Sequence, residues 1–520
     1  MDPVPRHSHL PDVSFDGGDL DCGNGLLLLI RRHIDPMRRG QLLEIRSTEI
    51  SVDEELPAWC RLTSNDLVSW TRDGVQRSFL VCKGKLSERV AASPGSAAAP
   101  VAARADSGPL LGGIVPVTIP AVLPAPAPAP AIAPFSVMGI GSWPRPAWLV
   151  RALHERTEGR LPEGEFQAAA DDAVRLAVRA QLDAGVDVLT DGEQRRDNYS
   201  SFVGGILDNC QLIPLTDLLP LVDDPEHFRR ELEQLDVPAS DVRHPAVFGP
   251  LGRSRPIAVH ELEFVRRISD RPVKVAIPGP YLLARTMWME CISDRAYTSR
   301  EHLAIDIVRV LREEIHFLLA AGAAIVQLDE PVLSEVVHTA SQGRRSFMCG
   351  ALSEKGDPAR ELALAREWIN RAVEGLPPER IAVHICRGNW TRDESAALTG
   401  DYRPLVPLLR ELRVGTLFLE LCTPRAGEME VLRGLRDDQR IGLGAVNQKH
   451  DAVESPDEIF ERGARAARLF GPHRVLLNPD CGFATFADNP IASAQVAEAK
   501  LRALAQAAER LRAAFPHAQA

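Results

Sequence analysis

The strongest pattern in the chain is a repeated pairing of a short apolar run with a longer amphipathic segment, starting near residue 135. Short, β-branched apolar runs are typical of buried strands, and they lie at 137–142, 186–191, 273–278, 324–329, 381–386, 416–421, 441–447 and 475–480. Helical periodicity lies between most of them, at 171–184, 300–321, 358–375 and 456–470. This alternation predicts an α/β protein with a (β/α)8 TIM barrel over residues 135–520. Residues 199–270 interrupt the alternation, and we expect helical hairpins there.

The first 87 residues carry a separate, smaller pattern. We expect residues 1–15 to be a mostly disordered tail and residues 16–87 to fold by themselves. Helices are expected at 25–37 and 53–62, the second one capped by Asp53. Strands are expected at 13–15, 42–47, 67–71 and 77–82, with the last two joined in a hairpin at Asp73-Gly74. This order predicts a small α+β two-layer sandwich. Residues 88–134, dominated by Ala, Pro, Gly and Ser, predict an extended linker.

Composition narrows the class of protein. A hydrophobic content of 45% with 25% charged residues is ordinary for a globular protein. A net charge of −11 argues against a nucleic-acid partner. The apolar runs are too short or too broken by proline to span a membrane, and the N-terminus lacks a secretion signal. Nine unevenly spaced cysteines do not predict a disulfide framework. We therefore expect a cytoplasmic protein without a membrane partner.

Candidate metal ligands lie at the ends of three predicted strands. His384 and Cys386 are two residues apart, so they share one face of their strand. An imidazole and a thiolate on one face provide half of a zinc site. Glu420, Cys422 and Cys481 follow two later strands, and strand ends converge at the C-terminal face of a barrel. The alternative for each single residue is ordinary packing in the core.

Five motifs occur in an order that resembles the catalytic barrel of cobalamin-independent methionine synthase. They are Gly139-Ile-Gly-Ser142, Leu189-Thr-Asp-Gly-Glu193, Val326-Gln-Leu-Asp-Glu-Pro331, His384-Ile-Cys386 and Asn478-Pro-Asp-Cys-Gly482. The resemblance covers about residues 135–515. It implies that Zn2+ is bound by His384, Cys386, Glu420 and Cys481, with Cys422 ranked second to Glu420. It also implies an amino-acid site made of Ile140, Gly141, Ser142, Glu193, Asp329 and Glu335. The alternative for Asp191, Glu193, Asp329 and Glu330 is capping of helices in the loops.

The side of the site that would hold the methyl donor departs from the family pattern. Trp288 is displaced by about two positions from the family's tryptophan, so it either stacks on a pterin or packs as a helix residue. Lys449 stands where the family has a proton-donating histidine, and His450 lies beside it. Either side chain can act as the acid, and histidine titrates nearer to neutral pH. The donor implied is methyltetrahydrofolate or a methylated corrinoid protein.

Residues 16–87 resemble the small TusA/SirA sulfur carriers. The matching residue is Cys22, before a predicted helix whose dipole favours a thiolate. The family has Cys-Pro-x-Pro there, whereas this chain has Cys22-Gly-Asn-Gly25. Cys22 is thus expected either to carry a persulfide to a relay partner or to belong to a degenerate docking domain.

The leading hypothesis for the whole chain is a zinc-dependent transferase that moves a methyl group to a small thiol, most simply homocysteine, to give methionine. Two alternatives remain at this stage. One is another zinc-thiolate alkyltransferase or lyase of the coenzyme M–epoxide type, which would not require acids that bind an amine. The other is a sulfur-relay protein that works through Cys22, although intact metal ligands argue against it.

Overall fold

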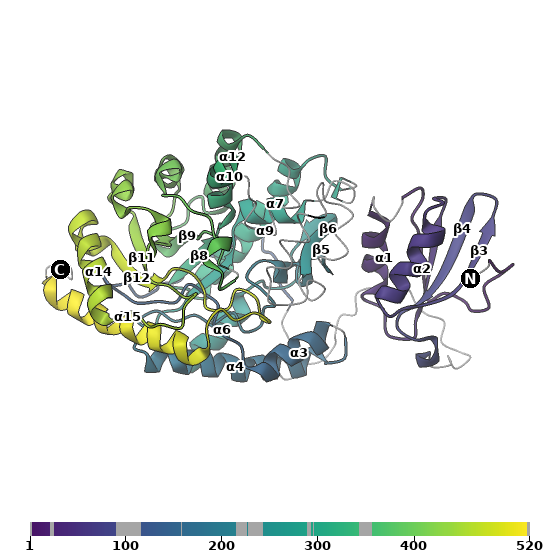
Figure 1. Cartoon of the computed structure of the whole chain (residues 1–520), viewed down its shortest axis with the longest axis horizontal. Coiled ribbons are helices and arrows are strands. Elements are labelled where there is room, and N and C mark those ends of the chain that lie inside the picture. Colours follow the sequence, from purple (N-terminus) through teal and green to yellow (C-terminus); the bar gives the residue numbers. More distant parts are fainter. Residues whose placement is uncertain are drawn as a thin grey trace. The chain divides into compact units, whose positions relative to one another are not determined.

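A computed structural model of the protein describes residues 3–20, 25–89, 116–157, 159–214, 226, 243–288, 293–294, 296–342, 356–389 and 391–516. The chain divides into two compact units (Figure 1). The smaller unit contains Met1–Leu110, and the larger unit contains nearly all of the remaining chain. Among the helices in these described ranges, none is long and apolar enough to cross a membrane.

The smaller unit has the predicted order of elements. Its sheet contains β1 (Val13–Asp16), β2 (Leu42–Ser47), β4 (Gln76–Cys82) and β3 (Asp66–Asp73), in that spatial order. Strands β1 and β2 are parallel, and the other pairs are antiparallel. Helix α1 (Leu27–Ile34) buries a leucine-rich face, and α2 (Val52–Leu62) buries Val52, Leu56, Trp59 and Cys60.

Two details of the smaller unit differ from the expectations. The N-cap of α2 is Ser51, so Asp53 is not the cap; it lies in the first turn and forms an ion pair with Arg77 at 2.7 Å. In the expected tail, residues 3–12 make contacts with the small sheet, among them the backbone N–H of Val4 with the carbonyl of Trp70 at 2.8 Å. The His7 ring makes hydrogen bonds to Ser69 and Ser78, at 2.8 and 3.0 Å. Cys22 lies outside the described residues.

The larger unit is built around a parallel six-stranded sheet in the order β12-β11-β10-β9-β8-β7. The strands are β7 (Lys274–Pro278), β8 (Ile325–Asp329), β9 (Ile381–Ile385), β10 (Thr416–Leu419), β11 (Arg440–Val446) and β12 (Val475–Pro479). The first two expected strands are present only as isolated parallel bridges. Val137 bridges Leu477 of β12, Met138 bridges Val188, and Leu189 bridges Val273. These bridges extend the parallel pairing beyond both edges of the sheet.

Helices surround the strands of the larger unit (Figure 1). They are α3 (Ala147–Thr157), α4 (Glu163–Asp183), α6 (Val259–Ile268), α7 (Pro280–Met287), α9 (Arg300–Ala320), α10 (Val332–Gln342), α12 (Pro358–Ala372), α13 (Val406–Glu411), α14 (Pro456–Phe470) and α15 (Ala494–Ala514). In the described part of the interruption at 199–270, the expected helical hairpins are not found. This part contains the two-stranded sheet of β5 (Asp208–Pro214) and β6 (Arg243–Gly252), followed by α6.

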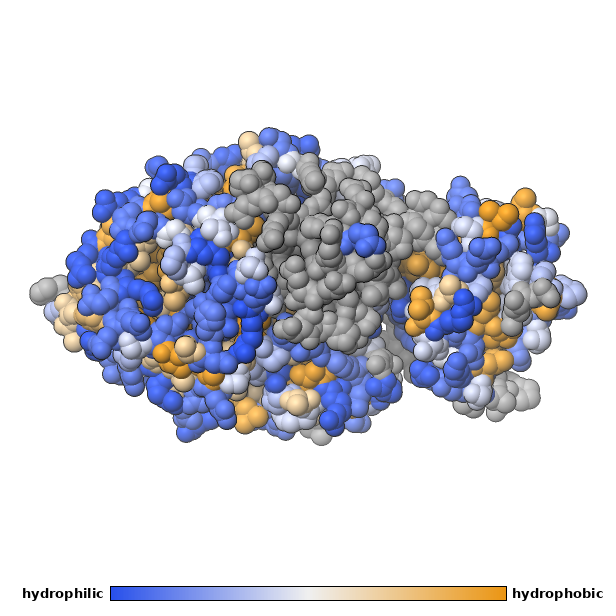
Figure 2. Space-filling model, in the orientation of Figure 1, coloured by the Kyte–Doolittle hydropathy of each residue, from blue (hydrophilic) through white to orange (hydrophobic). Residues whose placement is uncertain are grey.

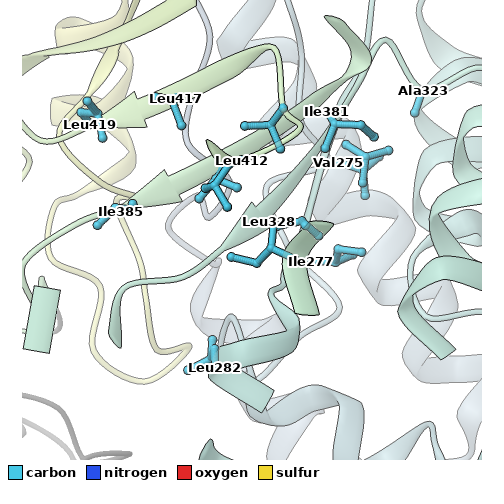
Figure 3. Close-up of a cluster of buried hydrophobic side chains, with 14 of the residues drawn as sticks. Val275, Ile277, Leu282, Ala323, Leu328, Ile381, Ile385, Leu412, Leu417 and Leu419 are labelled. Carbon is cyan, nitrogen blue, oxygen red and sulfur yellow. The ribbon is translucent and has the colours of Figure 1, made fainter. Parts of the chain in front are cut away.

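Alternate residues of the strands belong to two different hydrophobic clusters, as the period of a strand requires. One set packs against the helices, and it includes Val275, Leu328, Ile381 and Leu417 (Figure 3). The other set forms a small cluster on the opposite face: Met138, Ile140, Val188, Ile325, Ala382, Phe418 and Leu476. We call the face of the sheet that carries this small cluster the inner face. On the outside, hydrophilic residues dominate the visible surface of the larger unit (Figure 2).

The C-terminal part of the expected linker is bound to the larger unit. The backbone N–H of Ala127 donates to the carbonyl of Leu319 at the end of α9, 3.0 Å away. The guanidinium of Arg380 donates to the carbonyl of Ala127, and that of Arg440 to the carbonyl of Ile132 at 2.8 Å. Ile132 also packs against the inner cluster. Residues 117–134 are therefore a strap bound to the larger unit.

Candidate metal and amino-acid site

Three of the four predicted metal ligands lie together. His384 is in β9, Cys386 follows it, and Cys481 follows β12. One ligand atom from each of these buried residues lies within 4.8 Å of the other two. The strand ends bring them together because β9 and β12 belong to one parallel sheet, whose carboxyl ends point the same way.

The contacts of His384 leave one ring nitrogen for a metal. Its Nδ1 lies 3.3 Å from the carbonyl oxygen of Phe418. A carbonyl only accepts, so Nδ1 carries the proton and Nε2 has a lone pair. Nε2 is buried and has no hydrogen-bond partner among the described residues. A metal-binding histidine is usually oriented by this kind of hydrogen bond.

The two thiols of the group influence each other. Contact with Cys481 lowers the pKa of Cys386 well below its ordinary range, and the nearby His384 ring acts in the same direction. The Cys386 sulfur in turn raises the pKa of Cys481 well above its ordinary range. The first proton is therefore lost from this pair more easily than from an isolated thiol, and the second less easily. One imidazole and two soft sulfur donors, buried together, fit the ligand preference of zinc.

Glu420, the predicted fourth ligand, lies outside this 4.8 Å group. Its Oε1 accepts hydrogen bonds from the Arg425 guanidinium at 2.7 and 3.0 Å. Its Oε2 accepts from the backbone N–H of Arg387 at 3.0 Å and from Nδ2 of Asn389 at 2.8 Å. Four donors thus engage the carboxylate in this structure. The second choice, Cys422, lies elsewhere, because its Sγ is 3.9 Å from Oε1 of Glu454.

The first predicted substrate segment, Ile140–Ser142, lies between Glu193 and the Cys481 loop. The carbonyl of Gly141 accepts from the hydroxyl of Thr190 at 3.0 Å. A methyl group added to Gly141 would overlap Oε1 of Glu193, so the two are packed tightly. Ser142 Oγ accepts from the backbone N–H of Ala484 at 3.3 Å, and its carbonyl accepts from that of Phe483. This segment is therefore adjacent to the metal candidates.

Two predicted substrate acids lie on the inner face. Glu193 is buried with a positive φ of 53°, and its Oε2 has no hydrogen-bond partner among the described residues. Burial raises the pKa of Glu193. Asp329 ends β8, is paired with His384 in the sheet register, and has a pKa raised by burial to about 6. The negative charge of Glu193 contributes to that rise, so the two acids influence one another.

The other predicted acids have local partners. Glu335, in the first turn of α10, lies 3.5 Å from the Arg285 guanidinium. Glu330 does cap a helix: its carboxylate accepts from the backbone N–H groups of Tyr281 and Leu282 at the start of α7. The capping alternative therefore describes Glu330, whereas Asp329 beside it is left on the inner face.

Lys449 and His450 point to different environments. Lys449 is buried, its Nζ donates to the carbonyl of Asp393 at 3.1 Å, and burial lowers its pKa to about 8. The charges of Arg425, Glu420, Cys481 and Cys386 also act on it. The His450 side chain is 56% exposed and lies 3.0 Å from Glu394. Of the two candidate acids, Lys449 is therefore the buried one, and it interacts with the charges of the metal candidates.

Trp288 follows α7 and is partly buried against the main hydrophobic core. This contact agrees with the packing alternative for that residue.

Sequence reasoning missed two basic residues in the site. Arg425 engages both Glu420 and Glu394. Lys274 donates to the carbonyl of Ile140 and to the side chain of Gln327. A signal for Lys274 existed, because a lysine inside the apolar run 273–278 has the parity of the inner face. No local pattern marks Arg425.

Comparison with known proteins shows to which family the larger unit is similar. Residues 135–212 and 233–510 match the family model for the catalytic domain of cobalamin-independent synthase. A methionine synthase from Thermococcus kodakarensis is 28% identical over 345 residues, covering 66% of this chain and 85% of that protein. One from Saccharolobus solfataricus is 27% identical and covers 66% of this chain and 86% of that protein.

A solved structure agrees with these matches at the level of the fold. The B12-independent methionine synthase from Shewanella sp. W3-18-1, in complex with selenomethionine, superposes with a TM-score of 0.55 at 24% identity. The superposition covers 74% of this chain and 100% of that one.

Proposed function

Because the chain belongs to the cobalamin-independent methionine synthase family, we propose that it is a zinc-dependent methyltransferase that converts homocysteine to methionine. The observation that carries the zinc assignment is the buried group of His384, Cys386 and Cys481, with the unpartnered Nε2 of His384. A bound zinc ion would lower the pKa of a substrate thiol and so supply a nucleophilic thiolate at neutral pH.

The residues of the chain have distinct tasks in this proposal. His384, Cys386 and Cys481 hold the metal. Glu420 is the fourth ligand of the family pattern, and it can join them only by exchanging the hydrogen bonds of Arg425 and Asn389. The closed eight-stranded barrel, supported by the bridges at Val137, Met138 and Leu189, brings these strand ends together.

The amino-acid part of homocysteine is assigned to the neighbouring inner face. Glu193 and Asp329 bind the ammonium group, because two buried carboxylates side by side favour a cation between them. The hydroxyl of Ser142 and the backbone N–H groups beside it donate to the substrate carboxylate, and Glu335 stays a candidate for the same site. These acids favour an amino-acid thiol over the amine-free thiol of a coenzyme M–type enzyme.

The methyl donor is assigned to the side of Lys449. If the donor is a methylated folate, the nitrogen that loses the methyl group keeps the electron pair and needs a proton; a methylated corrinoid would leave as Co(I) and need none. Lys449 is the better-placed acid, because it is buried with a lowered pKa of about 8. The donor is a methylated folate or a methylated corrinoid protein, and Trp288 is the candidate for contact with a flat ring. The smaller unit, with its TusA-like order of elements and Cys22, is assigned a docking or sulfur-carrying role.

The test compares two thiols on two forms of the zinc-loaded protein. Asp329→Asn preserves shape but removes the charge that would bind the substrate ammonium. Charge-assisted hydrogen bonds are worth about 1.5–3 kcal/mol, so homocysteine should bind about 10- to 100-fold more weakly by calorimetry. Binding of 3-mercaptopropionate, which has no amine, should be unchanged. If the unmodified protein prefers 3-mercaptopropionate, the homocysteine assignment is wrong.

A further inference from the structure

The buried ammonium group of Lys274 is the least expected feature of the inner face. Lys274 is the first residue of β7 and is 1% exposed. Burial lowers the pKa of this amine, and the charges of Asp329 and Glu193 raise it. The Nζ lies 4.7 Å from the centre of the Phe418 ring. The hydrogen bonds of this buried group replace those that it would make to water.

Those hydrogen bonds connect two walls of the proposed amino-acid site. The Nζ of Lys274 donates to the carbonyl of Ile140, in the segment that packs on Glu193. It also donates to Oε1 of Gln327. An amide oxygen that accepts from lysine turns the amide nitrogen to the other side. Nε2 of Gln327 then donates to Oδ1 of Asp329 at 2.7 Å.

We infer that Lys274 is a positioning residue that sets substrate selectivity, through Gln327, by fixing Asp329 relative to the Ile140–Ser142 segment. The inference rests on the proposed function, because the ligand is the amino-acid part of the thiol substrate. Lys274 itself touches no reacting atom. Its role is to keep the acid that binds the ammonium at a constant separation from the backbone that binds the carboxylate. A thiol without an amine gains nothing from this arrangement.

The test uses Lys274→Met, which keeps the length of the side chain but removes its donors. With zinc loaded, homocysteine should bind about 10-fold or more weakly by calorimetry, whereas the affinity for 3-mercaptopropionate should change less than about twofold. Gln327→Met breaks the same relay one step later and should give the same selectivity loss. The double variant should bind homocysteine no more weakly than either single variant, since the effects of substitutions within one hydrogen-bond network are not additive.

Lys500→Met is the matched control. Lys500 is also fully buried, but it is paired with Glu454 at 2.8 Å, outside the relay. The Lys500→Met variant should keep the preference for homocysteine over 3-mercaptopropionate. Equal weakening of both thiols in Lys274→Met and Gln327→Met would show a merely structural role and overturn the inference. If Lys274→Met does not fold, the selectivity of Gln327→Met between the two thiols tests the inference by itself. A wild type without preference for homocysteine refutes the proposed function, whereas an unchanged preference in both variants refutes only the inference.

Discussion

Gly141→Ala is the smallest change that should disturb the amino-acid site. The added Cβ would overlap Oε1 of Glu193 and lie 3.0 Å from its Cδ. Non-bonded heavy atoms need about 3.5 Å, so the carboxylate has to withdraw by roughly 1 Å or more. Glu193 has little freedom to do so. It is 3% exposed, has a positive φ, and its carbonyl accepts from the Arg145 guanidinium at 2.7 Å.

The expected result follows from the displaced acid. If Glu193 binds the substrate ammonium, its withdrawal removes one charge-assisted hydrogen bond, worth about 1.5–3 kcal/mol. The Kd of homocysteine should therefore rise about 10- to 100-fold. Binding of 3-mercaptopropionate should hardly change. Zinc content should stay the same, because none of His384, Cys386 and Cys481 is near the added methyl group.

Gly139→Ala is a closely matched control. It adds the same methyl group two residues earlier, and nothing lies within 4 Å of the new atom. The measurement is calorimetric titration of both thiols into both zinc-loaded variants, with thermal unfolding as a check of the fold. The reasoning is refuted if the two variants bind homocysteine within twofold of each other. It is also refuted if Gly141→Ala weakens both thiols equally, since the displaced group would then not be an ammonium partner.

Three other predictions address the metal, the strap and pH. Cys481→Ser should lose most of the bound zinc in elemental analysis, whereas Cys422→Ser should retain it, because Cys422 lies outside the cluster of His384, Cys386 and Cys481. Equal retention of zinc in both variants would contradict the ligand assignment. Removal of residues 1–115 should leave the melting temperature of the larger unit unchanged. Removal of residues 1–134 should lower it, because the bound strap is lost together with its packing on the inner cluster. Equal melting temperatures of the two truncated proteins would show that the strap adds no stability. Burial lowers the pKa of His244 from 6.5 to about 4, so between these pH values the unfolded chain binds a proton that the folded chain does not, and the free energy of unfolding falls as the pH decreases from 6.5 to 4. In denaturant titrations, His244→Asn should remove up to about 3 kcal/mol of that loss. An unchanged pH dependence in the variant would contradict this prediction.

The sequence by itself determined the periodic elements and the face on which each side chain lies. Strands β9 and β12 lie where their apolar runs predict them, and a period of two puts His384 and Cys386 on one face. The order of elements in the smaller unit also follows from local pattern. These features depend on neighbours within a few residues, which a sequence displays directly.

Only the tertiary structure decided which partner each polar side chain finds. Arg425 engages Glu420, Lys449 is buried where His450 is exposed, and Lys274 links Ile140 to Gln327. The strap at 117–134 has the composition of a linker, yet it is held by Arg380 and Arg440. The energy of a buried charge or an extended backbone depends on groups that arrive from distant parts of the chain. Local sequence cannot contain that information, because burial and hydrogen-bond partners exist only after those segments have packed together.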